Sequence, residues 1–358
     1  MKKKYKFFVV SDIHGEYDAL MRTLQEAGYS PDNEEHFFVA IGDSFDRGPR
    51  SRDIYRFFRD LPSQRSKFVK GNHDLMFQEY LEKGMDGEFV LFNILHNGLG
   101  ATINSFGCLD MENLGASISI LDDCHSYIQR EYPGLKKFIK DMPLWFETDH
   151  TVFVHAGLNP ELFDWRQTDE HYALWDIADA HKRVPSCDKL IIFGHYHADQ
   201  VAEQARREGE NKVYKLNSAT TMVSTGRTNI TVRNYGNEDE FSATYLPNAR
   251  KIAIDGCTNL THKVNVLVFE DTITTPDEGE PTPEQPTDNI STIKISRDDA
   301  TGFVTTVEGV RADGIITTTA EWNPGVYTIN MANYVNYPEP QWFTAGLAET
   351  DIDGGERI

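Results

Sequence analysis

Five short groups of Asp, Asn and His side chains recur between positions 12 and 197. Each group stands next to at least one glycine and holds residue types that bind divalent metals. The groups are Asp12-Ile13-His14-Gly15, Gly42-Asp43-Ser44-Phe45-Asp46-Arg47-Gly48, Gly71-Asn72-His73-Asp74, His155-Ala156-Gly157 and Gly194-His195-Tyr196-His197. Oxygen and imidazole donors suit Mn, Fe or Zn. The absence of a thiolate among them disfavours a structural zinc site. The sequence therefore predicts a metal centre assembled from distant parts of the chain.

These donors are numerous enough for two metal ions. We expect Asp12 and His14 to hold the first ion, Asn72 and His155 to hold the second, and Asp43 to bridge them. Two ions about 3.5–4 Å apart can share a water, lower its pKa and clamp phosphoryl oxygens for in-line attack. The pattern therefore predicts hydrolysis of a phosphoester.

Three further side chains are candidates for the catalytic steps. His73 directly follows Asn72, so it borders the same cavity without having to bind metal, and we predict that it protonates the leaving oxygen. Asp46 lies three residues after Asp43 and can orient and charge His73. Arg47 can grip two phosphate oxygens with its planar fork of donors.

The elements that must position these groups alternate between strands and helices. Helical spacing of apolar residues predicts helices over 16–27, 50–61 and 73–83. Apolar runs without alternation are typical of strands buried on both faces, and they cover 5–10, 37–41, 67–69, 151–154 and 190–193. The pattern predicts βαβ units and an α/β sheet. Ligands bind outside the carboxyl ends of such strands, where all five groups stand, so we expect the groups to converge.

The later part of the chain differs in composition. Residues 200–250 are more polar and show few clear strands, whereas 251–269 return to apolar character and are expected to close the catalytic sheet. Residues 273–289 form an acidic Pro/Thr stretch typical of an extended linker. Residues 290–358 are Thr-rich with alternating apolar residues, which indicates a small β-rich module of unknown function. We therefore predict a catalytic domain over 1–272, then this linker and this module.

Charge and hydropathy exclude several classes of partner. The formal net charge is -21, which argues against nucleic acid and against an anionic membrane surface. No apolar run approaches the roughly 18 residues that a membrane span needs, and the apolar stretch behind Met1 is too short for a signal peptide. Four cysteines without a CxxC pair indicate reduced thiols. We expect a cytoplasmic protein, in a bacterial cell or a phage-infected host, and leave its oligomeric state open.

Taken together, the motifs resemble calcineurin-like metallophosphoesterases of the phosphoprotein phosphatase family, most closely the bacterial and bacteriophage (lambda-type) serine/threonine phosphatase branch. Secondary matches are Asn97-Gly98 with Ala101-Thr102, and Met142-Pro143-Leu144, so the resemblance covers roughly residues 5–270. It implies an αββα β-sandwich flanked by helices and two divalent ions, with Mn(II) expected and Fe, Zn or Ni as alternatives. It also implies six metal ligands, with His73 as the acid, Asp46 as its partner and Arg47 as a phosphate clamp. The implied ligands are Asp12, His14, Asp43, Asn72, His155 and His195.

Two positions depart from this branch. The segment Gly194-His195-Tyr196-His197 is similar to the Gly-His-x-His ending of calcineurin-like phosphodiesterases, which makes His197 a candidate seventh ligand. Trp175 is followed by Asp176-Ile177-Ala178, where the branch carries a second phosphate-binding Arg. The candidate substitutes for that Arg are Arg183, Lys182 and, more weakly, Arg166.

Three functions remain open at this point. The first is a phosphomonoesterase, a serine/threonine protein phosphatase, that works by in-line attack of a metal-bridging hydroxide with His73 as general acid. The second is a phosphodiesterase or dinucleoside-polyphosphate hydrolase, which the Gly-His-x-His ending favours. The third is a non-catalytic binding or structural protein with a vestigial phosphatase domain. The expected substrates are phosphorylated proteins or small phosphoesters.

Overall fold

The computed structural model describes residues 2–107 and 118–274 and, beyond these, the backbone of five strands between positions 292 and 345. The chain divides into two compact units, which are 1–158 with 171–282, and 159–170 with 283–358. The domain borders predicted at 272 and 289 stay a prediction. Within the described residues, no helix is long and apolar enough to cross a membrane.

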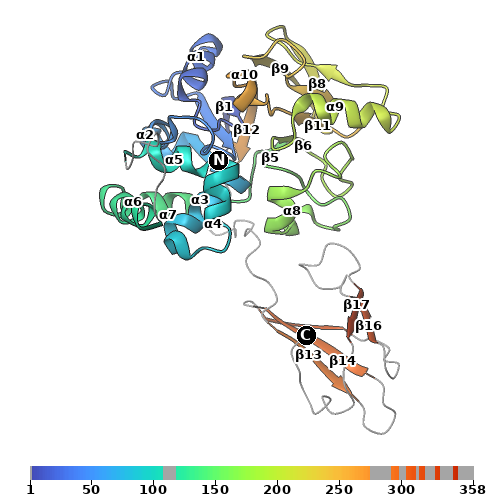
Figure 1. Cartoon of the computed structure of the whole chain (residues 1–358). Coiled ribbons are helices and arrows are strands. Elements are labelled where there is room, and N and C mark those ends of the chain that lie inside the picture. Colours follow the sequence, from blue (N-terminus) through green and yellow to red (C-terminus); the bar gives the residue numbers. More distant parts are fainter. Residues whose placement is uncertain are drawn as a thin grey trace. The chain divides into compact units, whose positions relative to one another are not determined.

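Two six-stranded sheets form the centre of the first unit (Figure 1). Their strand orders are β3-β2-β1-β12-β9-β8 and β4-β5-β6-β11-β10-β7. The first sheet consists of β1 (Lys2–Val10), β2 (His36–Ile41), β3 (Ser66–Val69), β8 (Thr221–Ser224), β9 (Asn229–Tyr235) and β12 (Val266–Thr274). The second consists of β4 (Trp145–Glu147), β5 (Thr151–Val154), β6 (Leu190–Phe193), β7 (Tyr214–Lys215), β10 (Thr244–Leu246) and β11 (Lys251–Ala253).

Side-chain alternation along β1 shows how the layers pack. Phe7 and Val9 enter a core that also holds residues of the second sheet, including Phe153, so the two sheets pack face to face. Phe8 and Val10 point to the opposite face and enter the core beneath the helices. Both faces of β1 are therefore buried, which explains why its sequence lacks alternation. The five predicted strands are present, but they divide between the two sheets of the sandwich that the resemblance implied.

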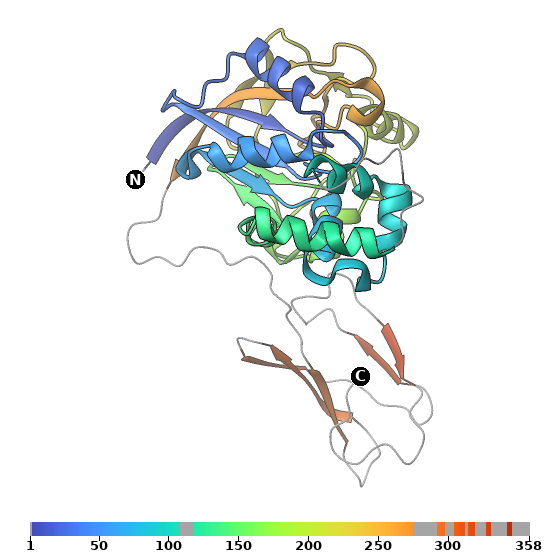
Figure 2. The same ribbon diagram turned by 60° about the vertical axis from the view of Figure 1, so that its left-hand side comes forward.

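Helices cover the outer face of the first sheet, as the rotated view also shows (Figure 2). They are α1 (Tyr17–Ala27), α2 (Ser51–Asp60), α3 (Asn72–Lys83), α5 (Leu99–Ser105), α6 (Ile118–Glu131) and α7 (Leu135–Lys140). The remaining helices are α4 (Val90–Phe92), followed by a π-helical turn (Asn93–Asn97), α8 (Glu170–Trp175), α9 (Ala198–Arg207) and α10 (Thr258–Thr261). The three helices predicted from periodicity are confirmed as α1, α2 and α3.

One sequence-based expectation for the first unit was wrong. Residues 200–250 were expected to hold few clear strands, yet β7, β8, β9 and β10 lie there. These strands are short or have exposed residues along much of their length, so they lack a strong apolar signal. Their pairing with the two central sheets is a long-range property that local composition does not carry.

The C-terminal part carries five described strands. A three-stranded antiparallel sheet contains β13 (Thr292–Arg297), β14 (Val304–Arg311) and β15 (Gly314–Thr318), and β16 (Tyr327–Asn330) pairs with β17 (Trp342–Ala345). The predicted β-rich character of this region is confirmed. The predicted linker falls almost entirely outside the described residues, because β12 extends to Thr274 and description resumes at Thr292.

Candidate metal centre

The predicted site residues follow the strands in the expected way. The first group follows β1, Asp43 follows β2, Asn72 and His73 begin α3 just after β3, and the last two groups follow β5 and β6. Seven of the predicted site residues are at most 3% exposed, so they belong to the protein interior and not to its hydrated surface. The seven are Asp12, His14, Asp43, Asp46, Asn72, His73 and His155.

The backbone at these strand ends is strained. Among the described residues, nine other than glycine have positive φ, and six of the nine are predicted site residues. The six are Asp12, His14, Asp43, Asp46, Arg47 and His195. Left-handed conformations at residues other than glycine cost about 1–3 kcal/mol each and cluster at functional sites. The strain is therefore an independent indication that these turns do chemistry.

Two motif glycines are required by close approach. Gly42, directly before Asp43, has φ +75°, and a Cβ there would lie 2.4 Å from His155 Nδ1. A Cβ on Gly194 would lie 2.2 Å from Asp12 Oδ2. The absence of a side chain at both positions lets turns from the two sheets meet.

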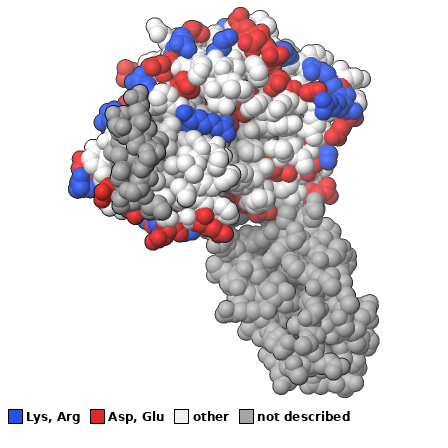
Figure 3. Space-filling model, in the orientation of Figure 1, with Lys and Arg blue, Asp and Glu red and all other residues white. Residues whose placement is uncertain are grey.

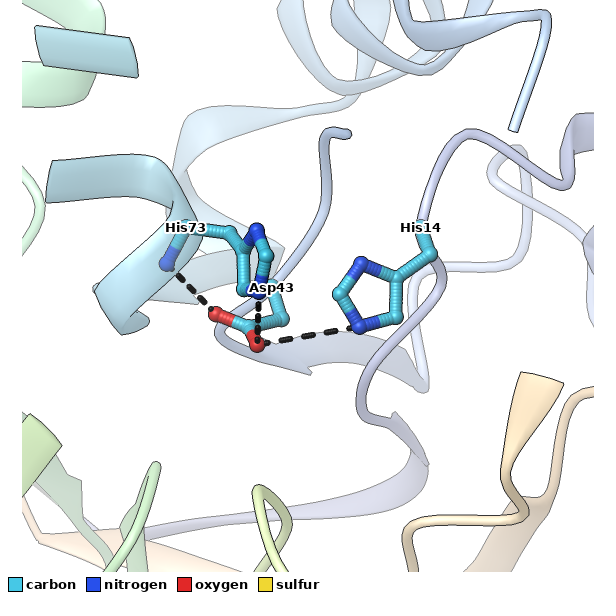
Figure 4. A group of neighbouring side chains, drawn as sticks. All are labelled: His14, Asp43 and His73. Atoms are coloured by element: carbon cyan, nitrogen blue, oxygen red, sulfur yellow. Dashed lines mark hydrogen bonds and ion pairs between the residues drawn. The ribbon is translucent and has the colours of Figure 1, made fainter. Parts of the chain in front are cut away.

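Asp43 lies at the centre of the converging side chains. Its Oδ2 is 3.7 Å from His14 Nε2 and 4.0 Å from His73 Nε2, as Figure 4 shows, and its Oδ1 is 3.3 Å from His155 Nε2. Two groups of three potential ligands share this carboxylate, one with His14 and His73 and one with His155 and His195. Asp43 therefore has the position that a bridging ligand needs.

The hydrogen bonds of two histidines fix which nitrogen faces Asp43. His14 Nδ1 lies 3.0 Å from the Phe45 carbonyl oxygen, and His155 Nδ1 lies 3.0 Å from that of Ile41. A carbonyl only accepts, so Nδ1 carries the proton in each ring and Nε2 presents a lone pair. A backbone carbonyl behind the ring is the usual support of a metal-binding histidine.

The amide of Asn72 lies among the other candidate ligands. One of its two polar atoms is 2.9 Å from His155 Nε2, 3.1 Å from His195 Nδ1 and 3.2 Å from both carboxylate oxygens of Asp43. The amide NH2 group can donate to these atoms, and the amide oxygen can bind a cation beside them. The donor set as a whole fits two divalent cations.

His73 and Asp46 form a buried pair beside this centre. His73 Nδ1 lies 2.9 Å from Asp46 Oδ2, and Thr102 donates its hydroxyl to Asp46 Oδ1 at 2.8 Å while accepting from the Asp46 backbone N–H at 2.7 Å. Burial lowers the pKa of His73, but the carboxylates of Asp43 and Asp46 outweigh burial and raise that pKa above its ordinary value. The ring is therefore held in an orientation and a charge state that suit a general acid.

The guanidinium of Arg47 spans the two histidines on one side of Asp43. Its Nη1 donates to His14 Nε2 at 3.0 Å, and its Nη2 lies 3.1 Å from His73 Nε2. A fork of donors in this place has the geometry to bind two oxygens of a phosphate, and this role of Arg47 stays a prediction.

Asp12 and His197 take less central positions. Asp12 accepts the His195 backbone N–H at 3.0 Å and the Ser11 hydroxyl, and burial together with Asp43 raises the pKa of Asp12 to about 8. His197 Nε2 lies 3.9 Å from Asp255 Oδ2. Neither Asp12 nor His197 belongs to the two groups of three potential ligands found among the described residues. Their roles as ligands stay predictions.

Sequence reasoning missed two residues that support the centre. Asp255 is 4% exposed, follows β11, and has a pKa that burial and Asp12 raise to about 8. The signal was available, because an apolar run is followed there by Asp255 and Gly256, and the other strand ends likewise combine a glycine with Asp, Asn or His. Thr102 was only part of a secondary motif match, and nothing in its sequence context indicated that it bonds Asp46.

The structure does not bring Arg183 into the site. Arg183 is exposed, and its charge acts on Arg250, whose pKa is lowered first by burial and then by Arg183. Arg250 precedes β11, whereas Asp255 and the metal centre lie beyond the other end of that strand. The neighbouring candidate Lys182 pairs with Asp179. Substrate binding by Arg183 therefore stays a prediction without structural support.

Comparisons with known proteins agree with this geometry. The family model described as calcineurin-like phosphoesterase matches residues 5–203. The chain is 40% identical over 168 residues to serine/threonine-protein phosphatase 2 of Escherichia coli (strain K12), and this match covers 43% of this chain and 72% of that relative. The chain is 38% identical over 198 residues to the symmetrical bis(5'-nucleosyl)-tetraphosphatase of Actinobacillus pleuropneumoniae serotype 3 (strain JL03), and this match covers 55% of this chain but only 56% of that relative.

A solved metallophosphoesterase from Sphaerobacter thermophilus has 16% sequence identity and a TM-score of 0.35, with 76% of this chain and 89% of that chain covered. The match of the family model spans more than half of the sequence and includes all five motif groups. The chain belongs to the calcineurin-like phosphoesterase family, a family of metal-dependent phosphoesterases.

Proposed function

We propose that this chain hydrolyses phosphomonoesters at a two-metal site, with phosphoserine and phosphothreonine in proteins as the first substrate class. The observation that carries the proposal is the position of His73, whose Nε2 faces Asp43 and Arg47 while its Nδ1 is held by Asp46. A charged acid and a guanidinium fork at one point suit a phosphate dianion and its leaving oxygen. The similarity to the E. coli phosphatase supports the same substrate class.

Each side chain of the centre has a separate role in this proposal. Two divalent cations, when bound, would supply an activated water and offset the charge of the phosphate. His14 and Asp12 would hold one ion, and Asn72, His155 and His195 would hold the other. Asp43 would bind both ions. We expect these ligands to favour Mn(II). Arg47 binds two phosphate oxygens, and His73 Nε2 gives its proton to the leaving oxygen while Asp46 keeps the ring in place.

A second candidate function is hydrolysis of dinucleoside polyphosphates. The similarity to a tetraphosphatase favours it, and so does an aromatic cavity that adjoins His195. The two candidates use the same metal centre and differ in what lies beyond the phosphate.

The test compares substrates on purified protein loaded in turn with Mn, Fe, Zn or Ni. The proposal expects faster turnover of p-nitrophenyl phosphate than of bis-p-nitrophenyl phosphate, together with release of phosphate from a phosphoserine peptide. A clear preference for the diester would contradict the phosphomonoesterase reading. No turnover of any phosphoester with any metal would instead support the vestigial domain considered above. The Asp43→Asn protein, prepared in parallel, measures contaminating phosphatase.

A further inference from the structure

A cavity of about 540 Å³ lies beside the metal centre and is called the aromatic pocket here. One face of α3, the segment from Phe89 through α4 and its π-helical turn, and the end of α8 form its walls. Its lining residues include Leu75, Met76, Phe89, Phe92, Asn97 and Trp175. All of these residues belong to the first unit.

Residues in three walls of the aromatic pocket adjoin residues of the metal centre, either along the chain or through a contact. Leu75 and Met76 follow His73 on α3. Asn97 precedes Gly98, whose carbonyl accepts the Arg47 backbone N–H at 3.1 Å. The Trp175 ring meets the His195 ring edge to face, with 6.3 Å between centroids. We therefore expect the group attached to a phosphate at Arg47 to extend towards the pocket.

The lining favours a flat and uncharged group. Phe89, Phe92 and Trp175 are 57%, 55% and 36% exposed, so their rings remain available for stacking. Asn97 donates its amide to Asn93 Oδ1 at 2.8 Å, and since Asn93 is only 4% exposed, the amide of Asn97 is the one that can offer a donor and an acceptor to a base edge. On the face drawn in Figure 3, white uncharged areas adjoin a patch of Lys or Arg near the middle, and most other charged side chains lie along the edges.

A peptide segment fits the same lining less well. Each peptide unit that enters a pocket brings an N–H and a C=O that need partners. The described lining offers three side-chain amides and no strand. The lining also holds Glu79, Glu82 and Lys83, of which Lys83 pairs with Glu79 at 3.2 Å, so its charged side chains leave one net negative charge that disfavours an anionic group in the pocket.

We propose that the aromatic pocket binds the nucleobase of a nucleotide substrate whose phosphate chain reaches the metal centre. The base stacks on Phe92 and Trp175, and its polar edge meets the Asn97 amide. This inference rests on the proposed phosphoesterase activity and specifies its second candidate, because it names the pocket residues that select a nucleotide.

The first experiment measures kcat/KM for diadenosine tetraphosphate and for glycerol 2-phosphate, a substrate without a ring. Phe92→Ala is expected to lower the ratio of the two values about tenfold through KM for the nucleotide, since one lost stacking contact has about that effect. Phe92→Tyr should restore the ratio. Leu95→Ala is the matched control, because Leu95 is 66% exposed on the same turn and lies outside the lining, and it should leave the ratio unchanged.

The second experiment measures binding without turnover. Adenosine, which has no phosphate, is expected to quench the tryptophan fluorescence of the full chain, and Trp175→Phe should remove most of that quenching. This measurement needs neither metal nor hydrolysis.

The outcomes separate the pocket from the activity. If the wild type cleaves glycerol 2-phosphate but Phe92→Ala and Leu95→Ala behave alike, the pocket proposal is overturned and the proposed function stands. If Phe92→Ala impairs only cleavage of a phosphopeptide, the pocket serves peptides and the proposal is again overturned. If the wild type cleaves nothing, the proposed function fails, and adenosine quenching alone then decides whether the pocket binds a base.

Discussion

Two histidine–aspartate pairs of similar geometry occur in the first unit, and they lie in different surroundings. At the metal centre His73 Nδ1 is 2.9 Å from Asp46, and at the edge between the two sheets His150 Nδ1 is 2.6 Å from Asp271. Both aspartate side chains are fully buried. Geometry within the pair therefore does not distinguish them.

The difference lies in what the other ring nitrogen and the carboxylate contact. His73 Nε2 faces Arg47 and Asp43, at the point where the predicted metal ligands converge. Asp271 instead accepts hydroxyl hydrogen bonds from Thr148 and Thr151 in addition to its contact with His150. The comparison teaches that the neighbours of such a pair decide its role: those of His73 suit the proposed general acid, whereas those of His150 suit a structural contact.

The largest effect on bound metal and turnover should follow from replacing Asp43, which His73 of the His73–Asp46 pair faces. Asp43→Asn removes a negative charge and a shared ligand, so we expect loss of bound metal and turnover close to background. Elemental analysis and p-nitrophenyl phosphate turnover check this. Retention of two ions per chain would show that Asp43 does not bridge.

The next effect separates the two histidines. His73→Asn should keep the metal but slow turnover by roughly 10²–10⁴, the usual contribution of a general acid. His150→Asn should change turnover by no more than about twofold, because it contacts nothing at the centre. Equal losses in the two variants would remove the distinction drawn between the pairs.

A smaller effect concerns pH. The Asp46 carboxylate helps to raise the pKa of His73, so a neutral amide at position 46 should lower that pKa. The acid form is then lost at lower pH, and the basic limb of the pH–rate profile of Asp46→Asn should move to lower pH. Asp271→Asn supplies the control and should leave the profile in place. A basic limb that stays fixed in Asp46→Asn would assign it to another group.

The smallest effect on catalysis is expected at the second pair. Asp271→Asn weakens contacts to His150, Thr148 and Thr151, which should lower the free energy of unfolding by about 1–3 kcal/mol. Urea denaturation measures this loss, and kcat at a temperature well below unfolding should match that of the wild type. A variant of normal stability with a reduced kcat would contradict the structural role of this pair.

The sequence was most informative where one segment carries the whole signal. Apolar runs that end in Asp, Asn or His indicated β1, β2, β3, β5 and β6, and the position of His73 next to Asn72 indicated its place at the site. Two contacts between distant segments that involve no motif residue on one side were not foreseen. Thr102 reaches Asp46 across 56 positions, and the aromatic pocket needs Trp175 to approach α3. Such contacts depend on packing between elements, which periodicity does not encode.

The left-handed backbone at Asp12, His14, Asp43, Asp46, Arg47 and His195 has a consequence for engineering. Glycine adopts these φ values without strain, so replacing any of the six by glycine should recover some folding free energy while removing a reactive side chain. Substitutions in these turns that raise thermal stability are therefore expected to lower activity. A library selected for survival at high temperature alone should lose its reactive turns first, and a stabilised version of this fold should be sought by changing residues away from them.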